Sequence, residues 1–304
     1  MKGIDVLHRF GFDAVEDPES IYPFSPVYRV NDTIVKRTQR PIERASRLMN
    51  YTRMLKVNGV NVVTPVELSK PNPQSMGEHT YVVYPFVEGN TYKGEDHEIF
   101  QAGRLLGQIH RLSYKGNPYQ LEKYDVYDFT KEEVIESVRK IEENAAEYAV
   151  NHNQLKEKLL RIVRQQSTLE KSELPHVATP HDYKANNLIF TPKPYLIDPD
   201  NAAWVPRIFD LALVLLLFHN ELSTAPDEMF TPDQWQQFLA GYKKSITFTD
   251  MEIASWSMSL EHVFLDEVMW LMAEGKEDWV DPAQRKLFES LLTFIADSSA
   301  YPLD

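Results

Sequence analysis

The segment His181–Asp200, with the sequence HDYKANNLIFTPKPYLIDPD, predicts a β-hairpin that follows a polar loop. Two short apolar runs flank a turn with two prolines, which is the pattern of paired strands joined by a short loop. We expect residues 191–194 to form a four-residue loop and Asn187 to lie opposite Asp198 at the open end. The predicted pairs are Leu188 with Ile197, Ile189 with Leu196 and Phe190 with Tyr195.

The polar residues of this segment predict a phosphoryl-transfer site. Directly opposed residues on neighbouring strands have Cβ atoms roughly 5 Å apart, so Asn187 and Asp198 can share one metal ion. Their oxygen donors suit Mg²⁺. Asp182, five residues before Asn187, is left free to take a proton from a hydroxyl group. The alternative is that these residues only cap a turn and end a strand, where Asp and Asn are common.

The spacing of Asp182, Asn187 and Asp198 resembles the catalytic and metal-binding segments of protein-kinase-like enzymes. The closer resemblance is to the aminoglycoside phosphotransferase and choline kinase family, whose second motif often reads Ile-Asp-Trp-Asp before a downstream Asp-Leu. Here IDPD at residues 197–200 is followed by DL at residues 210–211. The resemblance extends over nearly the whole chain.

The resemblance implies an α+β fold of the protein-kinase-like, two-lobe type. We expect a small antiparallel-sheet lobe that binds the nucleotide at residues 1–89, and a large, mainly helical lobe with the catalytic and acceptor sites at residues 90–304. The resemblance also implies ATP, with GTP left open, and Mg²⁺ as cofactors. The implied reaction transfers phosphate to a hydroxyl group of a small molecule.

Composition narrows the partners. The chain has 304 residues and no cysteine, which excludes disulfides and thiolate chemistry. A net charge of -13 argues against nucleic acid or an anionic membrane surface as a partner. The first residues lack the apolar core of a signal peptide, and the longest apolar run, Leu211 to Phe218, is too short to span a bilayer. We therefore expect a cytoplasmic protein in which this run is a buried helix.

The expected small lobe combines short strands with few helices. Asn31-Asp32 separates two β-rich runs and predicts a hairpin. The expected helices are residues 3–10 and 41–57, and the expected strands are residues 27–30, 33–36, 62–68 and 81–87.

Helix-start signals dominate the rest of the chain. Residues 97–112 have helical periodicity and end in His110, as in a helix of the resembled family. Asp281-Pro282 fits the start of another helix by the N-cap and N1 rule. Capping boxes predict three further starts, at Thr130 with Glu133, Thr231 with Gln234 and Thr249 with Glu252.

The resemblance makes Lys36 the candidate phosphate-binding lysine, because it ends the apolar strand TIVK. A solvated lysine at a strand end is the alternative. The nucleotide-covering loop at residues 22–27 has no glycine, and Ser25 is its expected donor. The helix glutamate that orients such a lysine is missing: Glu43 stands about two turns early, and Asn50 occupies the expected register.

The segment YVVYPFVEG, residues 81–89, resembles the strand and hinge on which these enzymes lay adenine. An adenine edge needs a backbone acceptor and a donor two residues apart, which we assign to the Pro85 carbonyl and the Val87 N–H. Tyr84 then guards the back of the pocket. A plain edge strand that leads into a linker is the alternative.

The resemblance assigns roles in the catalytic loop. Asp182 orients the acceptor hydroxyl and acts as base, and Lys184 meets the transferring phosphate. The family has a histidine two residues before this aspartate, but here Pro180 stands there, so we interpret His181 as a packing residue. Asp210 is interpreted as a structural acid that braces the loop.

Acidic and aromatic residues near the C-terminus predict the acceptor site. Residues 251–304 contain eleven acids and three bases. Glu267, Glu274 and Asp278 can share one helix face, which suits a cationic acceptor such as an aminoglycoside or choline. A solvated helix face is the alternative. The candidate acceptor residues are Glu261, Asp266, Glu267, Trp270 and Glu274.

Two classes of function stay open. The favoured class is an ATP- and Mg²⁺-dependent phosphotransferase that acts on a small cationic alcohol. The alternative is a non-catalytic kinase-like protein, such as spore-coat relatives, that binds a nucleotide or a protein partner. A protein kinase ranks third, because only eleven residues separate Asp198 from Asp210, too few for an activation segment.

Overall fold

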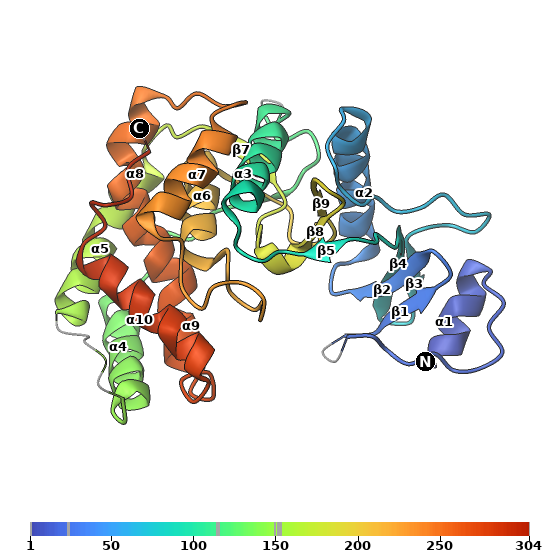
Figure 1. Cartoon of the computed structure of the whole chain (residues 1–304), viewed down its shortest axis with the longest axis horizontal. Coiled ribbons are helices and arrows are strands. Elements are labelled where there is room, and N and C mark those ends of the chain that lie inside the picture. The colour runs from blue at the N-terminus through green and yellow to red at the C-terminus, as the bar shows by residue number, and fades with distance from the viewer. Residues whose placement is uncertain (1, 23–24, 114–115, 149, 151–153, 304) are drawn as a thin grey trace.

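A computed structural model describes residues 2–22, 25–113, 116–148, 150 and 154–303. Figure 1 shows a small β-sheet with helices α1 and α2 at one end of the molecule and a larger helical body at the other. Three short strands, β5, β8 and β9, lie between them together with helix α3. The predicted α+β class, with a small antiparallel sheet and a large helical part, is confirmed.

The small sheet has the strand order β1-β2-β4-β3, and all its pairs are antiparallel. Its central residues Val35 and Val83 are fully buried against helix α1. The predicted hairpin around Asn31-Asp32 is present, with Val30 opposite Thr33. The elements are α1 (Gly3–Phe10), β1 (Val27–Val30), β2 (Thr33–Thr38), α2 (Ile42–Val57), β3 (Gln74–Met76) and β4 (His79–Pro85).

The strand predicted at residues 62–68 is wrong. This segment forms only an isolated bridge between Val62 and Leu196, and the N–H of Val66 donates to the Val83 carbonyl at 3.0 Å. Pro65 interrupts the run and removes a ladder donor. The edge of β4 is instead covered by β3, which the sequence did not predict.

The predicted hairpin is present, but its register differs by one residue. β8 (Leu188–Phe190) pairs with β9 (Pro194–Leu196), so that Leu188 lies opposite Leu196. The loop is residues 191–193, not 191–194. Pro194 is the first residue of its strand, where the missing N–H costs little.

Because of this register, Asn187 faces Ile197 and not Asp198. The N–H of Ile197 donates to the Asn187 carbonyl at 2.9 Å. β5 (Asn90–Thr91) completes this small sheet in the order β5-β8-β9.

The helical part contains the predicted helix starts. Thr130, Thr231 and Thr249 each accept a hydrogen bond from the N–H three residues on, and Asp281 caps the helix that opens with Pro282. A third sheet has the order β6-β10-β7. The remaining elements are α3 (Asp96–Arg111), β6 (Glu122–Lys123), α4 (Lys131–Ala145), α5 (Leu155–Glu170), β7 (His176–Thr179), the 3-10 helical turn η1 (Ala185–Asn187), β10 (Ala203–Pro206), α6 (Arg207–Leu217), α7 (Pro232–Tyr242), α8 (Asp250–Val263), the π-helical segment η2 (Phe264–Val268), α9 (Met269–Glu274) and α10 (Pro282–Ala296).

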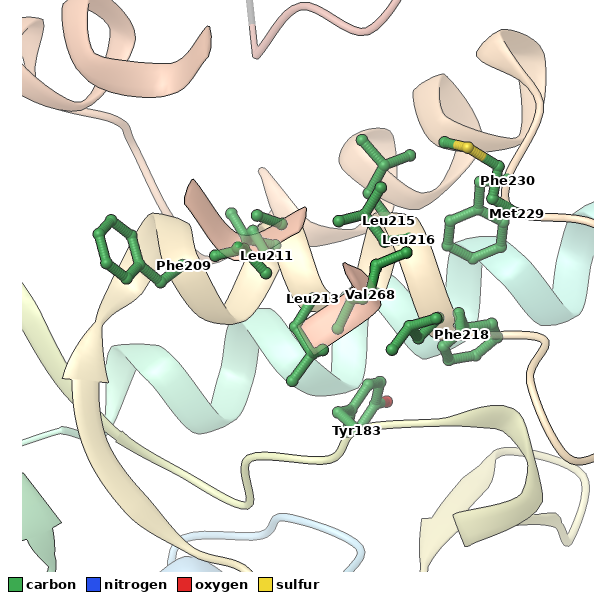
Figure 2. Close-up of a cluster of buried hydrophobic side chains, with 14 of the residues drawn as sticks. Tyr183, Phe209, Leu211, Leu213, Leu215, Leu216, Phe218, Met229, Phe230 and Val268 are labelled. Carbon is green, nitrogen blue, oxygen red and sulfur yellow. The ribbon is translucent and has the colours of Figure 1, made fainter. Parts of the chain in front are cut away.

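Helix α6 runs through the core, as its apolar sequence predicted. Leu211, Leu215 and Phe218 are completely buried. Figure 2 shows Tyr183, from the loop after β7, next to this cluster, and its ring centroid lies 6.1 Å from that of Phe218. The core thus fixes the residue that follows Asp182.

Helices α3 and α7 pack closely because glycines face the opposite backbone. A Cβ atom on Gly103 would lie 2.0 Å from the Phe238 carbonyl oxygen, and one on Gly241 would lie 2.0 Å from that of Phe100. Any larger residue would force these helices apart. None of the described helices is both long enough and apolar enough to cross a membrane.

Candidate active site

The catalytic loop follows strand β7 and takes an uncommon backbone conformation. His181 and Asp182 both have positive φ, 45° and 81°. Such left-handed residues persist only where their surroundings hold them. Tyr183 supplies one anchor, since its ring is buried and its hydroxyl donates to the Ala102 carbonyl at 2.8 Å.

Asp210 on α6 supplies the second anchor. One of its carboxylate oxygens, Oδ2, accepts hydrogen bonds from Thr179 Oγ1 at 2.9 Å and His110 Nε2 at 3.0 Å. The other, Oδ1, lies 3.6 Å from His181 Nδ1. Burial raises the pKa of Asp210, but the hydrogen bond from His110 and the charges of His110 and His181 outweigh this and hold the pKa well below its usual value. Asp210 is therefore a charged brace beneath the loop.

Asp182 is held by its neighbours in an accessible position. Its Oδ1 lies 2.9 Å from Lys184 Nζ, and its Oδ2 accepts a hydrogen bond from Asn201 Nδ2 at 3.3 Å. Lys184 also lies 3.6 Å from Glu221. Burial lowers the pKa of Lys184, but the charges of Asp182 and Glu221 outweigh burial and raise the pKa. The lysine thus stays charged beside the candidate base.

Lys36 is joined to two carboxylates of the segment after β9. Its Nζ lies 2.6 Å from both oxygens of Asp198 and 3.1 Å from Asp200 Oδ2. Tyr84 donates its hydroxyl proton to the other oxygen of Asp200 at 3.2 Å. Burial lowers the pKa of Lys36, yet the two carboxylates raise it above its usual value.

Asp200 is a site residue that the sequence analysis did not assign. Glu43 and Asn50 of helix α2 are both exposed, and neither is among the side chains that hold Lys36. Asp200 takes the place of the missing helix acid. In the sequence, the only indication of this role was that Asp200 is the second acid of the IDPD segment.

Asn187 and Asp198 are suitable ligands for a hard divalent cation. Asn187 Nδ2 donates to the Asp182 carbonyl at 2.9 Å, which leaves its Oδ1 as an acceptor. Burial raises the pKa of Asp198, Lys36 opposes this, and Asp200 adds to it. A divalent cation would relieve the repulsion between the two aspartates. No group of three or more His, Asp or Glu side chains able to hold a metal occurs among the described residues.

The backbone at the end of β4 forms a hydrogen bond on its β2 side. The N–H of Phe86 donates to the Asp32 carbonyl on the β2 side at 2.8 Å. Successive residues of an extended strand direct their backbone groups to opposite sides, so the carbonyl of Pro85, the last residue of β4, points away from β2. Apolar side chains form one cluster around Tyr84: Ala45, Val63, Val82, Val87, Tyr195 and Ile197.

The nucleotide-covering loop is only partly described. Pro23 and Phe24 lie outside the described residues. Ser25 donates its hydroxyl proton to the Arg37 carbonyl at 3.4 Å, next to Lys36 in the sequence. Its hydroxyl is thus directed toward the backbone of β2.

A cavity of about 420 Å³ opens beside Asp182. Glu267 and Trp270, two of the predicted acceptor residues, line it together with His181 and Lys184. The indole of Trp270 is 51% exposed. Burial raises the pKa of Glu267, the charge of Asp182 adds to this, and His181 and Lys184 oppose it. Glu267 makes no hydrogen bond or ion pair with any described residue, in contrast to the other buried acids.

The remaining predicted acceptor residues lie elsewhere. Glu261 is buried on α8 and pairs with Lys158 at 2.9 Å and Arg161 at 2.6 Å. Glu274 pairs with Lys140 at 2.7 Å. Asp266 accepts a hydrogen bond from Tyr124 at 2.8 Å, and burial raises its pKa to about 6. The expected single wall is therefore wrong for Glu261 and Glu274.

The π-helical segment η2 explains this difference. It spans Phe264–Val268 between α8 and α9, so spacings counted across it do not follow an α-helix. Asp278 lies beyond the end of α9 at Glu274 and is not on a helix face. Inserted π-turns occur frequently at functional sites, and this one supports Glu267 at the cavity.

Comparison with known proteins is consistent with this geometry. The profile of the phosphotransferase enzyme family matches residues 24–245. The chain belongs to this family. No curated protein matches this phosphotransferase significantly. The predicted enzyme class and family are confirmed.

Solved structures confirm the kinase-like fold. A microcompartment-associated aminopropanol kinase has a TM-score of 0.67 at 13% identity, over 99% of this chain and 98% of that chain. A spectinomycin phosphotransferase in its AMP-bound complex has a TM-score of 0.65 at 18% identity, over 97% and 98%. An amicoumacin kinase in complex with AMP-PNP, Ca²⁺ and Ami has a TM-score of 0.60 at 16% identity, over 91% and 85%.

Proposed function

We propose that this phosphotransferase transfers the γ-phosphate of ATP, with Mg²⁺, to a hydroxyl group of a small molecule that carries an amine. The observation that carries the proposal is the position of Asp182. Its carboxylate lines the 420 Å³ cavity and also accepts a hydrogen bond from Asn201, which follows the Asp198–Asp200 segment. One acid thus contacts both the acceptor space and the segment that holds Lys36.

The nucleotide is proposed to lie between the small sheet and this segment, with residues 1–89 and 90–304 as the two lobes. Lys36 binds its phosphates, and the Pro85 carbonyl and Val87 N–H bind the adenine edge. Asn187 and Asp198 hold the metal. When bound, Mg²⁺ neutralises charge on the phosphate oxygens as the phosphoryl group is transferred.

The chain's own residues then act on the acceptor. Asp182 accepts a hydrogen bond from the acceptor hydroxyl and so directs a lone pair of the hydroxyl oxygen toward the phosphorus. The carboxylate takes the hydroxyl proton late in the reaction. Lys184, 2.9 Å from Asp182, supplies positive charge for the transferring group. The left-handed backbone at Asp182, fixed by Tyr183 and Asp210, keeps the carboxylate in place.

The amine of the acceptor is proposed to bind at Glu267 and Trp270. Glu267 is a partly buried carboxylate that forms no hydrogen bond or ion pair with the described residues, and burying such a group is costly unless it is paired. An ammonium group would supply the partner. The half-exposed ring of Trp270 adds a cation–π surface.

A screen for ADP release tests this proposal. Alcohols that carry an amine are expected to stimulate Mg²⁺-dependent ADP release, whereas the matched alcohols without an amine do so weakly. Glu267→Gln should raise the KM for amine-bearing acceptors about tenfold or more, since a charge-assisted contact is lost. Glu274→Gln is the control, because Glu274 pairs with Lys140 outside the cavity.

Two results would count against the proposal. An acceptor preference that ignores the amine removes the role of Glu267. Nucleotide binding without phosphate transfer to any alcohol would favour the alternative of a non-catalytic member, which the glycine-free loop, the missing helix glutamate and the displaced histidine support.

A further inference from the structure

The acceptor cavity contains basic side chains on the side of helix α2. Arg40, just before α2, and Arg44, in its first turn, line the same cavity as Asp182 and Glu267. The sequence analysis expected only acids and aromatic rings around the acceptor. The cavity thus presents charges of both signs.

Arg40 has N–H donors that form no hydrogen bond with the described residues. Its Nε donates to the Asp200 carbonyl at 3.3 Å, and its Nη2 donates to Asn201 Oδ1 at 2.7 Å. These two bonds use two of the five N–H groups of a guanidinium. No carboxylate of the described residues forms an ion pair with Arg40, whereas Arg44 pairs with Glu122.

The surroundings of Arg40 favour an anion beside it. The guanidinium is half-buried; burial and then the charge of Arg44 lower its pKa, while the carboxylates of Glu122 and Asp200 oppose this. Glu122 already pairs with Arg44, so Arg40 is the guanidinium whose remaining N–H donors are left for a carboxylate or phosphate of a bound molecule. The planar donor fork of arginine matches such groups.

Asp182 lies between the two charged ends of the cavity. On one side, Asn201 connects it to Arg40 by two hydrogen bonds of 3.3 Å and 2.7 Å. On the other side, its charge acts on Glu267. An acceptor whose hydroxyl contacts Asp182 can therefore extend one group toward Arg40 and another toward Glu267.

We propose that the acceptor is a zwitterionic alcohol: an anionic group binds Arg40 while the amine binds Glu267. This inference rests on the proposed function and specifies its substrate class. A carboxylate is the simplest group that fits, and the experiment is designed around it.

Three alcohols that differ in their charged groups test the anion site at Arg40 and the amine site at Glu267 separately. Homoserine carries both groups, aminopropanol lacks the carboxylate, and γ-hydroxybutanoate lacks the amine. In the wild-type protein, homoserine is expected to have a kcat/KM about tenfold to a hundredfold above either truncated alcohol, since each charge-assisted contact contributes about that much.

Arg40→Gln should remove the advantage of homoserine over aminopropanol, because it should raise the KM for homoserine far more than the KM for aminopropanol. Glu267→Gln should remove the advantage over γ-hydroxybutanoate. Arg47→Gln is the control, because Arg47 lies one turn further along α2, outside the cavity lining, and donates to the Gln120 carbonyl.

The rival role for Arg40 is to orient Asp182 through Asn201 or to bind the transferred phosphate. In that case, Arg40→Gln would lower kcat for homoserine and aminopropanol alike, and this result would overturn the proposal. Homoserine that binds no more tightly than its truncated relatives in calorimetry, with the nucleotide present, would also overturn it.

Calorimetry keeps this test separate from that of the proposed function. If none of the three alcohols is phosphorylated, tight binding of homoserine that depends on Arg40 and Glu267 still supports the zwitterion site. Phosphate transfer would then be the part that fails.

Discussion

Lys36 and Asp198 form an ion pair in which Nζ lies 2.6 Å from both carboxylate oxygens. The two residues come from strand β2 and from the segment after β9, so the pair connects the small sheet to the catalytic hairpin. A metal ion bound to Asp198 would compete with Lys36 for the carboxylate, and phosphates bound to Lys36 would compete with Asp198 for the ammonium group. The ion pair thus brings together the proposed phosphate-binding lysine and a proposed metal ligand.

Lys36→Met should make stability depend on Mg²⁺. Without Lys36, Asp198 and Asp200 repel each other, and we expect a loss of about 1–2 kcal/mol in the free energy of unfolding, because the pair is only partly buried. Mg²⁺ should recover part of this loss. Denaturation with and without Mg²⁺ measures it, with the exposed Lys193→Met as control. A loss that Mg²⁺ leaves unchanged would argue against metal binding at these aspartates.

Asp210→Asn should destabilise the fold and the catalytic loop together. The change leaves His110 and Thr179 with a neutral, weaker partner in a buried position, which costs about 3 kcal/mol or more. Because the pKa of Asp210 is lowered, its stabilisation is present at neutral pH and is lost only in acid. Urea unfolding at pH 7 measures the effect, with the exposed Asp128→Asn as control. Wild-type stability in the variant would show that Asp210 is not the brace.

Asp266 should make the protein less stable as the pH rises. Burial raises its pKa to about 6, so the native state favours the protonated form. This stabilisation is complete below the usual pKa of an aspartate and is lost as the pH passes 6. Asp266→Asn should therefore match the wild type near pH 4 and exceed its unfolding free energy by on the order of 2 kcal/mol at pH 7.5.

Urea unfolding at the two pH values checks this prediction. Glu289→Gln, an exposed change on α10, should show no such difference between them. A variant that is less stable than the wild type at pH 7.5 would mean that the hydrogen bond from Tyr124 outweighs the cost of burying the charge.

The sequence predicted the features that depend on local chemistry. The capping boxes at Thr130, Thr231 and Thr249 fixed helix starts because side chain and backbone lie three residues apart. The buried helix α6 followed from its apolar run. The loop with Asp182 could be recognised because its residue order carries the chemistry.

Features that depend on register or on distant partners could not be predicted. Pro194 joins a strand although it resembles a loop residue, which shifts the hairpin by one residue. The π-helical turn at Phe264–Val268 changes which acids share a face. The ion pairs of Glu261 and Glu274 depend on α5 and α4, which no local pattern reveals.

The central claim is that Asp182 orients the acceptor for phosphoryl transfer. Its most direct test compares acceptor-stimulated ADP release and nucleotide affinity in the wild type and in Asp182→Asn. We predict that turnover falls by about a hundredfold to ten-thousandfold while nucleotide affinity stays unchanged, because the amide cannot take the proton and positions the hydroxyl poorly. Turnover equal to that of the wild type would contradict the account.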